Sequence, residues 1–117
     1  MRQHFVVKSR FCSLNEFYRM HHMKQGKVKR ENDEVVAWSA KAAHIKPYTK
    51  PVQIDCLWVE PNKRRDHDGI HFGVKFILDG LVKAGILKDD SPRYVKRITH
   101  EVAYDRDNPR IEVWIDG

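Results

Sequence analysis

The chain of 117 residues has only two cysteines, Cys12 and Cys56, and they lie far apart in the sequence. They match neither the close pair of a zinc knuckle nor a disulfide framework, so reduced and buried thiols are the preferred interpretation. Every apolar run is far shorter than the roughly 20 residues that span a bilayer. The N-terminal residues MRQHFVVKSR lack the apolar stretch of a secretory signal. These absences predict a cytoplasmic protein.

No repeat, low-complexity tract or linker interrupts the sequence, so one domain over residues 1–117 is expected. What the chain has in surplus is positive charge, because 22 Lys and Arg against 16 Asp and Glu give a net charge of +6. A basic surplus favours polyanionic partners such as nucleic acids. Its placement sharpens this expectation, since Lys63, Arg64 and Arg65 stand directly before a pair of aspartates.

The spacing of the apolar residues predicts a small α+β domain in which two main helices pack on a mixed β-sheet. Four segments have the pattern of strands: His4–Phe11, Val52–Glu60, Arg93–Tyr104 and Arg110–Ile115. The second strand is apolar on both sides at its end, which indicates that both faces are covered there. The last two strands are separated by a short turn and are expected to form a hairpin.

Two longer helices are expected, at 32–44 and Gly69–Lys83, and they would end at Lys46–Pro47 and Gly85. Each has an apolar stripe that should face the core. The stripes are Val35, Trp38, Ala42 and Ile45 in the first helix, and Ile70, Val74, Ile77, Leu78 and Leu81 in the second.

Two features precede these helices. Glu16 follows Ser13 at the spacing of a capping box, which predicts the start of a short helix. Residues 24–30 contain a glycine and four basic residues. We interpret this segment as a polar connection between elements, or as an arm that contacts phosphates.

The chemistry is concentrated around the second long helix. Asp66 and Asp68 stand two residues apart just before it, so both carboxylates can reach one cation. Mg²⁺ prefers such oxygen ligands. The pair Asp89 and Asp90 follows the helix, and a turn that folds back would bring another carboxylate to the same ion. A metal-bound water could then attack a phosphodiester, and Lys75 could donate to a phosphate oxygen or to the leaving group.

At about 100° per residue, Lys75 also falls on the side of this helix opposite its apolar stripe. That side consists of Asp68, Phe72, Lys75 and Asp79. A helix face that carries two carboxylates and an amine suits metal-assisted chemistry at a phosphate.

Each of these features also has a simpler interpretation. Asp66 or Asp68 could only cap the helix. Lys75 and Asp79 could form an ordinary surface pair, and Asp89–Asp90 could belong only to a turn. Two aspartates at this spacing are weakly specific by themselves.

Three blocks of the sequence together resemble the RusA-like family of Holliday junction resolvases, the crossover junction endodeoxyribonucleases. The blocks are Arg65–Asp68, Lys75–Leu81 and Ala84–Asp90. Their order and spacing are more specific than any single block. Leu14–Glu16 and Val35–Trp38 also resemble N-terminal features of some members, although the strong match covers about Lys63 to Ser91.

The resemblance implies a small α+β homodimer that uses Mg²⁺, with Mn²⁺ as a possible substitute. It would bind branched DNA and resolve four-way junctions by paired, symmetric nicks. Carried over residue by residue, it makes Asp66, Asp68 and Asp90 the metal ligands and Lys75 the catalytic lysine.

Beside these four residues, the resemblance gives Asp79 a supporting role. Asp89 is also expected to be a supporting residue, because it stands next to Asp90 in the second acidic pair. The basic run Lys63–Arg65 is the expected DNA contact because it directly precedes the first aspartate.

Two positions depart from the family pattern. Gly69 stands where the family usually has an Asn, so a side-chain amide that could orient a ligand or contact DNA is missing. Lys75 follows Asp68 by seven residues, farther than in the best-known form of the motif. A non-catalytic DNA-binding module of the same fold is therefore the alternative, and a small interaction protein is a third reading. Against the alternative, clustered aspartates repel a polyanion unless a cation intervenes.

Overall fold

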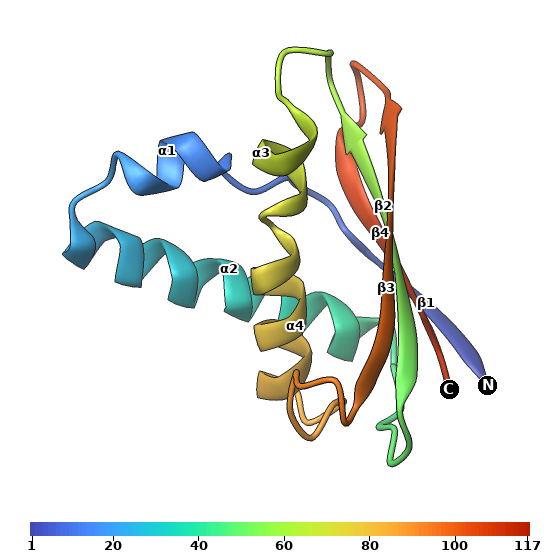
Figure 1. The fold of residues 1–117 in the computed structure, drawn as a ribbon. Helices are drawn as coiled ribbons and strands as arrows, with labels where there is room; N and C mark the ends of the chain where they lie inside the picture. Colours follow the sequence, from blue (N-terminus) through green and yellow to red (C-terminus); the bar gives the residue numbers. More distant parts are fainter.

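A computed structural model describes residues 1–117. The elements in chain order are β1 (Arg2–Val7), α1 (Leu14–Tyr18), α2 (His22–Ala42), β2 (Val52–Glu60), α3 (His67–His71), α4 (Val74–Lys83), β3 (Val95–Tyr104) and β4 (Arg110–Asp116). The strands form one sheet in the order β1-β4-β2-β3, and all helices lie on one of its faces (Figure 1). This confirms the predicted small α+β fold with a mixed sheet. None of the helices combines the length and apolar content that crossing a bilayer requires.

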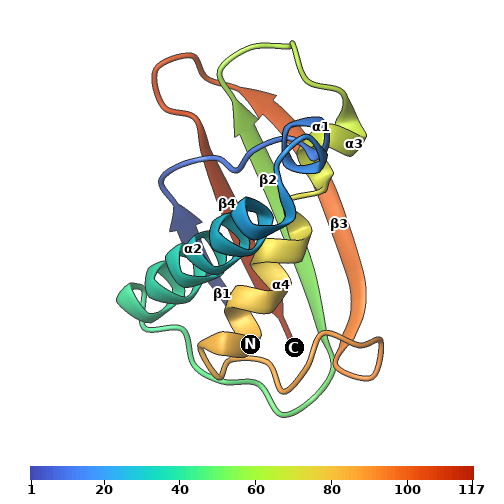
Figure 2. The same cartoon turned by 90° about the vertical axis from the view of Figure 1, so that its left-hand side faces the viewer.

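The core lies between the sheet and α4. Alternate residues of β2 point toward the helices and are buried, as the pattern of this strand predicts. From α4, Phe76, Ile77 and Leu81 are fully buried against them. Figure 2 shows α2 running at an angle beside α4, and α2 also packs against β1. The crossing is close at Gly80, where an added Cβ would lie 2.5 Å from the Cβ of Val36.

The strand β2 occupies its predicted range, Val52–Glu60. The strand β1 begins two residues before its predicted start at His4 and ends at Val7, before the predicted end at Phe11. The predicted hairpin of the last two strands is wrong. β4 pairs antiparallel with β1 and β2, and β3 pairs parallel with β2. The turn after β3 instead passes over the end of β2, where the Asp105 backbone N–H donates to the Glu60 carbonyl at 2.9 Å. The two-sided apolar end of β2 suits this central position.

The interpretation of residues 24–30 as a connection is wrong, because α2 begins at His22 and runs through them. Ion pairs along the helix support this first half. Lys27 pairs with Glu31 at 3.9 Å, and Lys29 pairs with Asp33 at 2.6 Å. Nothing in the segment breaks a helix, since one interior glycine is tolerated at a modest cost.

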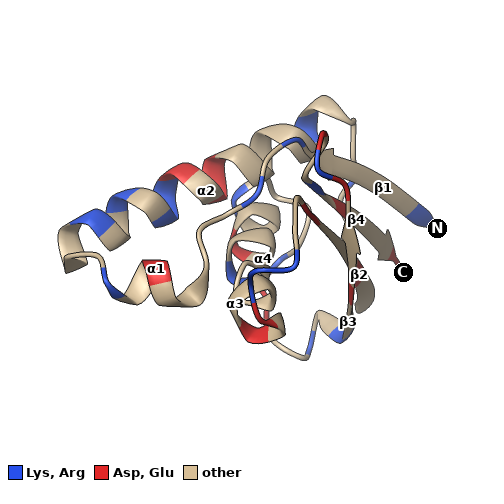
Figure 3. Cartoon of the chain, turned by 90° about the horizontal axis from the view of Figure 1, so that it is seen from above, with Lys and Arg blue, Asp and Glu red and all other residues tan.

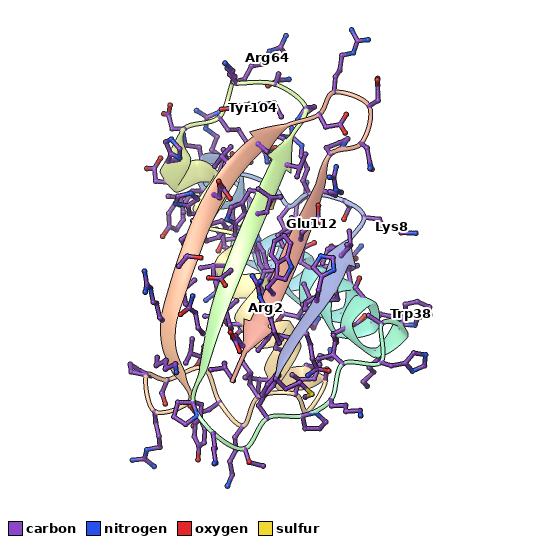
Figure 4. All side chains as sticks on the ribbon, turned by 90° about the vertical axis from the view of Figure 1, so that its right-hand side faces the viewer. Arg2, Lys8, Trp38, Arg64, Tyr104 and Glu112 are labelled. Atoms are coloured by element: carbon purple, nitrogen blue, oxygen red, sulfur yellow. The ribbon has the colours of Figure 1, made fainter.

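The predicted core face of α2 is wrong for Val35, Trp38 and Ala42, which are exposed, whereas Ile45, just after the helix, is partly buried against the core. Val35 is 42% exposed and Trp38 is 74% exposed. The residues that the helix buries are Asp33, Val36, Ala37 and Ala40. The close crossing at Gly80 requires small side chains on the facing side, so the large indole of Trp38 points away from it (Figure 4).

The predicted helix Gly69–Lys83 is divided into α3 and α4 around Phe72 and Gly73. An added Cβ at Gly73 would lie 2.9 Å from the Trp58 ring, so the chain there packs directly on β2. The apolar stripe faces the core as predicted, with Val74 and Leu78 only partly buried. The opposite side, which carries Asp68, Phe72, Lys75 and Asp79, is not exposed throughout. The Phe72 ring packs against that of Phe17, with the two ring centroids 5.1 Å apart.

The helix ends follow the expected turn chemistry. The Ser13 and Glu16 side chains form the predicted capping box of α1. Gly85 has φ +76° and follows α4, and the Ile86 N–H donates to the Leu81 carbonyl at 3.0 Å, which is a Schellman motif. His44 adopts the same left-handed conformation after α2, so that helix ends before the predicted stop at 46–47.

The other face of the sheet carries no helix (Figure 4). Polar and charged side chains occupy it. The Arg2 guanidinium lies 5.6 Å from the Trp114 ring centroid and 3.7 Å from Asp55. His4 and Glu112 are 3.0 Å apart. These contacts account for an open sheet face that does not need a covering layer.

Candidate functional site

The loop after β2 carries the residues singled out by the sequence. Asp66 precedes α3 with an extended backbone, which is the position of a helix cap, but its side chain makes no capping hydrogen bond. Asp68 lies in the first turn of α3, and its Oδ1 accepts from the Gly69 N–H at 2.9 Å. Both side chains are exposed. A capping role therefore does not account for Asp66, whose carboxylate remains available for a ligand.

A polar cavity of about 210 Å³ lies beside these two aspartates. Its walls come from the start of α1, the loop after β2 and the start of α3. The lining residues are Ser13, Leu14, Asn15, Arg64, Arg65, Asp66, Asp68 and Gly69. Because a water molecule occupies about 30 Å³ in the liquid, the cavity has room for a cation with several of its waters. Figure 3 shows the basic loop segment beside the acidic start of α3.

Arg65 ties the walls of the cavity together. Its Nη1 donates to the Phe11 carbonyl at 2.8 Å, and its Nη2 donates to Oε1 of Glu16 at 2.7 Å. Its side chain is only 17% exposed and also approaches buried Glu60 at 3.8 Å. Hydrogen bonds from Ser13, together with Arg65, hold the pKa of Glu16 below its usual value. The contact of Arg65 with DNA stays a prediction, and the guanidinium already has protein partners.

The other two basic residues of the loop are exposed. Arg64 lies at the tip of the loop after β2, and its side chain has no protein partner (Figure 4). The Lys63 amine lies 5.2 Å from the Tyr104 ring centroid, in a cation–π contact. Both cations are placed where a phosphate backbone could reach them.

Lys75 and Asp79 differ in their surroundings. Lys75 is exposed in the first turn of α4. Asp79 lies 2.8 Å from Lys29 of α2, and that amine also contacts Asp33. The anticipated surface pair of Lys75 with Asp79 is not formed. Asp79 instead joins α4 to α2, and its supporting role in the site stays a prediction.

The second acidic pair lies beyond the other end of α4 (Figure 1). Asp89 accepts from the Ser91 N–H at 2.8 Å, and the hydrogen bonds from Ser91 hold the pKa of Asp89 below its usual value. Asp90 is exposed. The 10 residues of α4 alone extend about 15 Å, so the turn does not fold back to the cavity. One chain contains no group of three His, Cys, Asp or Glu side chains positioned to hold a metal.

A row of rings behind α3 was missed by sequence reasoning. The rings of His71 and His100 stack at 4.2 Å, and Nε1 of Trp58 donates to Nδ1 of His100 at 3.0 Å. Burial lowers the pKa of both histidines. His67 precedes His71 by one helical turn, and this spacing in the sequence could have indicated that the two rings lie side by side on one helix face. The row joins α3 to the edge strand β3 and so steadies the helix that carries Asp68.

Comparison with known proteins adds no relative: no protein-family model matches the chain, and no curated protein matches it at a significant level.

Proposed function

We propose that the protein is a Mg²⁺-dependent endodeoxyribonuclease that resolves four-way DNA junctions by paired nicks, in DNA recombination and repair. The main supporting observation is the polar cavity beside Asp66 and Asp68, flanked by the exposed cations of Lys63 and Arg64. Carboxylates beside a basic loop suit a polyanion when a cation lies between them. Mn²⁺ would serve in place of Mg²⁺.

The donor set suits a hard divalent cation. The cavity offers carboxylate, hydroxyl and amide oxygens and no sulfur or imidazole nitrogen. Asp66 and Asp68 would hold the ion, which when bound lowers the pKa of its water and stabilises charge on the phosphate. Lys63 and Arg64 would position the DNA backbone, and Lys75 would donate to the phosphate or to the leaving oxygen.

Asp90 enters this site only from a second copy of the chain. Because α4 separates Asp90 from Asp66 and Asp68 within one chain, a shared ligand set requires a dimer. A two-fold dimer would build two equivalent sites, each with Asp66 and Asp68 from one subunit and Asp90 from the other. Two opposed sites also match the approximate two-fold symmetry of a junction that needs two cuts.

We place this activity in the cytoplasm. Cys12 and Cys56 are both unpaired, and burial raises the pKa of Cys56 to about 12. A protonated, buried thiol is unreactive, and unpaired cysteines are usual in reducing compartments.

The deciding experiment compares a synthetic four-way junction with linear duplex of the same sequence, in Mg²⁺ and in EDTA. Symmetric, metal-dependent nicks in the junction alone, abolished by Asp68→Asn without loss of binding, are the expected result. Retained cutting by Asp68→Asn would contradict the site. The separation of Asp90 from the cavity by α4 favours one second candidate, a non-catalytic DNA-binding module. Tight junction binding without any cleavage would select that candidate.

A further inference from the structure

We infer that Asn15 is a further binding residue of this site, and that its carboxamide oxygen contributes to the coordination of the cation held by Asp66 and Asp68. This inference rests on the proposed function. It starts from the cavity, which Asn15 lines together with both aspartates. Side-chain amide oxygens are ordinary ligands of hard cations, either directly or through a bound water.

The side chain of Asn15 is free for such a role, whereas its neighbours are not. Ser13 and Glu16 are committed to the capping box of α1. The Asn15 side chain is exposed and makes no hydrogen bond to another protein group. Of the polar side chains at the start of α1, it is therefore the one that can serve a ligand without breaking the helix.

The wall that carries Asn15 is held in place relative to Asp66. Arg65, the residue before Asp66, bonds to Glu16 at 2.7 Å and to the Phe11 carbonyl at 2.8 Å, one on each side of the α1 start. On its inner side, α1 buries Phe17 against Phe72. The backbone that carries the Asn15 amide is therefore already ordered, so only the side-chain rotamer has to be fixed when a ligand binds.

The opposite wall leaves the space that this amide uses. Gly69 has no side chain, and a Cβ added there would meet only the Cβ of Ser13, at an ordinary contact distance of 3.8 Å. A Cβ at position 69 therefore fits without a clash, and position 69 lines the same cavity as Asn15. An Asn at 69 should be able to replace the amide of Asn15, so the two positions are predicted to be interchangeable.

The test compares Asn15→Ala, the double variant Asn15→Ala with Gly69→Asn, and Asn108→Ala as a matched control on an exposed turn. Binding of Mn²⁺ is followed by the electron paramagnetic resonance signal of the free ion, and junction cleavage is titrated with Mg²⁺. Asn15→Ala should weaken Mn²⁺ binding and raise the half-saturating Mg²⁺ concentration about 10-fold, with cleavage at saturating Mg²⁺ largely retained. Thermal stability should not change, and Gly69→Asn should restore the affinity.

Unchanged Mn²⁺ affinity in Asn15→Ala would overturn the inference. If Asp68→Asn still abolished cleavage, the proposed function would stand without it. A wild-type protein that neither binds Mn²⁺ nor cuts junctions would overturn both, and the wild-type measurement alone identifies that case. Should Asn15→Ala fail to fold, Asn15→Asp keeps the size and one oxygen, and it must bind Mn²⁺ at least as tightly as the wild type. Weaker binding by that variant would overturn the inference.

Discussion

The guanidinium of Arg65 bonds to the carboxylate of Glu16 at 2.7 Å, across 49 residues of sequence. This contact joins α1 to the loop that carries Asp66. Its neighbour Arg64 has the same charge but an exposed side chain without a protein partner. Adjacent arginines therefore have opposite roles, one within the fold and one at its surface.

Arg65→Ala should lower the free energy of unfolding by about 2 kcal/mol, because hydrogen bonds to charged groups carry about 1.5–3 kcal/mol and the loss leaves acceptors unpaired. Urea unfolding monitored by tryptophan fluorescence measures this change. Arg64→Ala is the matched control and should leave stability within about 0.5 kcal/mol of the wild type, as exposed substitutions do. Equal effects of the two substitutions would contradict the division of roles.

Replacing Lys63 and Arg64 together by Ala should weaken junction binding and reduce its dependence on salt. Each phosphate contact that is lost lowers the slope of log affinity against log salt by about 1. Fluorescence anisotropy with a labelled junction at several salt concentrations gives the slope. Lys50, also exposed but on the loop before β2, provides the control substitution. A slope that the double substitution does not move would mean that this loop does not contact DNA.

Sequence patterns predicted those parts of the fold that depend on interactions between residues close together in the chain. The alternation in Val52–Glu60 is a property of one strand, and the capping box of Ser13 and Glu16 spans one helical turn. The hairpin prediction failed because strand order depends on distant partners. β4 pairs with β2 and not with β3, and the turn chemistry at 105–109 suits either arrangement.

Packing against a distant element explains the other differences. Trp38 has the spacing of a core residue, but the close approach of α2 to Gly80 admits only small side chains. At the candidate site, Asp66 and Asp68 come together because they are neighbours in sequence. Asp90 does not join them, since the length of α4 separates the two ends. The sequence also does not indicate that Arg65 turns inward, because its partners Phe11 and Glu16 are distant in the chain.

Two glycines, Gly80 at the crossing of α2 and α4 and Gly26 away from it, are predicted to respond in opposite ways to substitution by Ala. Gly80→Ala would place a Cβ 2.5 Å from the Cβ of Val36 and should destabilise the protein by about 1–3 kcal/mol, the usual cost of overpacking. Gly26→Ala, on α2, meets only the flexible end of Arg30 at 3.5 Å. It should stabilise the protein by up to about 1 kcal/mol, because Ala is the better helix former. Urea unfolding of both variants tests the pair, and a neutral Gly80→Ala would show that the helices can separate at no cost.

The stacked histidines predict a loss of stability in mild acid. Burial lowers the pKa of His71 and of His100 in the folded protein. A neighbouring histidine adds to each shift, because His67 further lowers the pKa of His71, and His71 further lowers that of His100. The unfolded chain therefore takes up protons first, near the ordinary histidine value of about 6.5. Stability from these groups is present above that pH and is lost as the pH falls below it.

Urea unfolding between pH 8 and pH 5 measures this dependence. His100→Gln should flatten the curve in this range, because one of the two shifted groups is gone. His22→Gln, at an exposed site at the start of α2, is the control and should keep the wild-type slope. A wild-type protein equally stable at pH 8 and pH 5 would contradict the prediction.

Mixing two inactive variants tests most directly the proposal that two subunits share each site. Asp68→Asn and Asp90→Asn should each abolish cleavage as homodimers, because every site then lacks one carboxylate. In a mixed dimer one site collects both defects, while the other has Asp66 and Asp68 from one subunit and an intact Asp90 from its partner. The mixture should therefore regain single nicks, with about half of the dimers mixed at equal concentrations if subunits exchange freely. Strand-specific labels on a four-way junction distinguish single from paired cuts. If all ligands came from one chain, each subunit would keep its own defect and mixing would restore nothing.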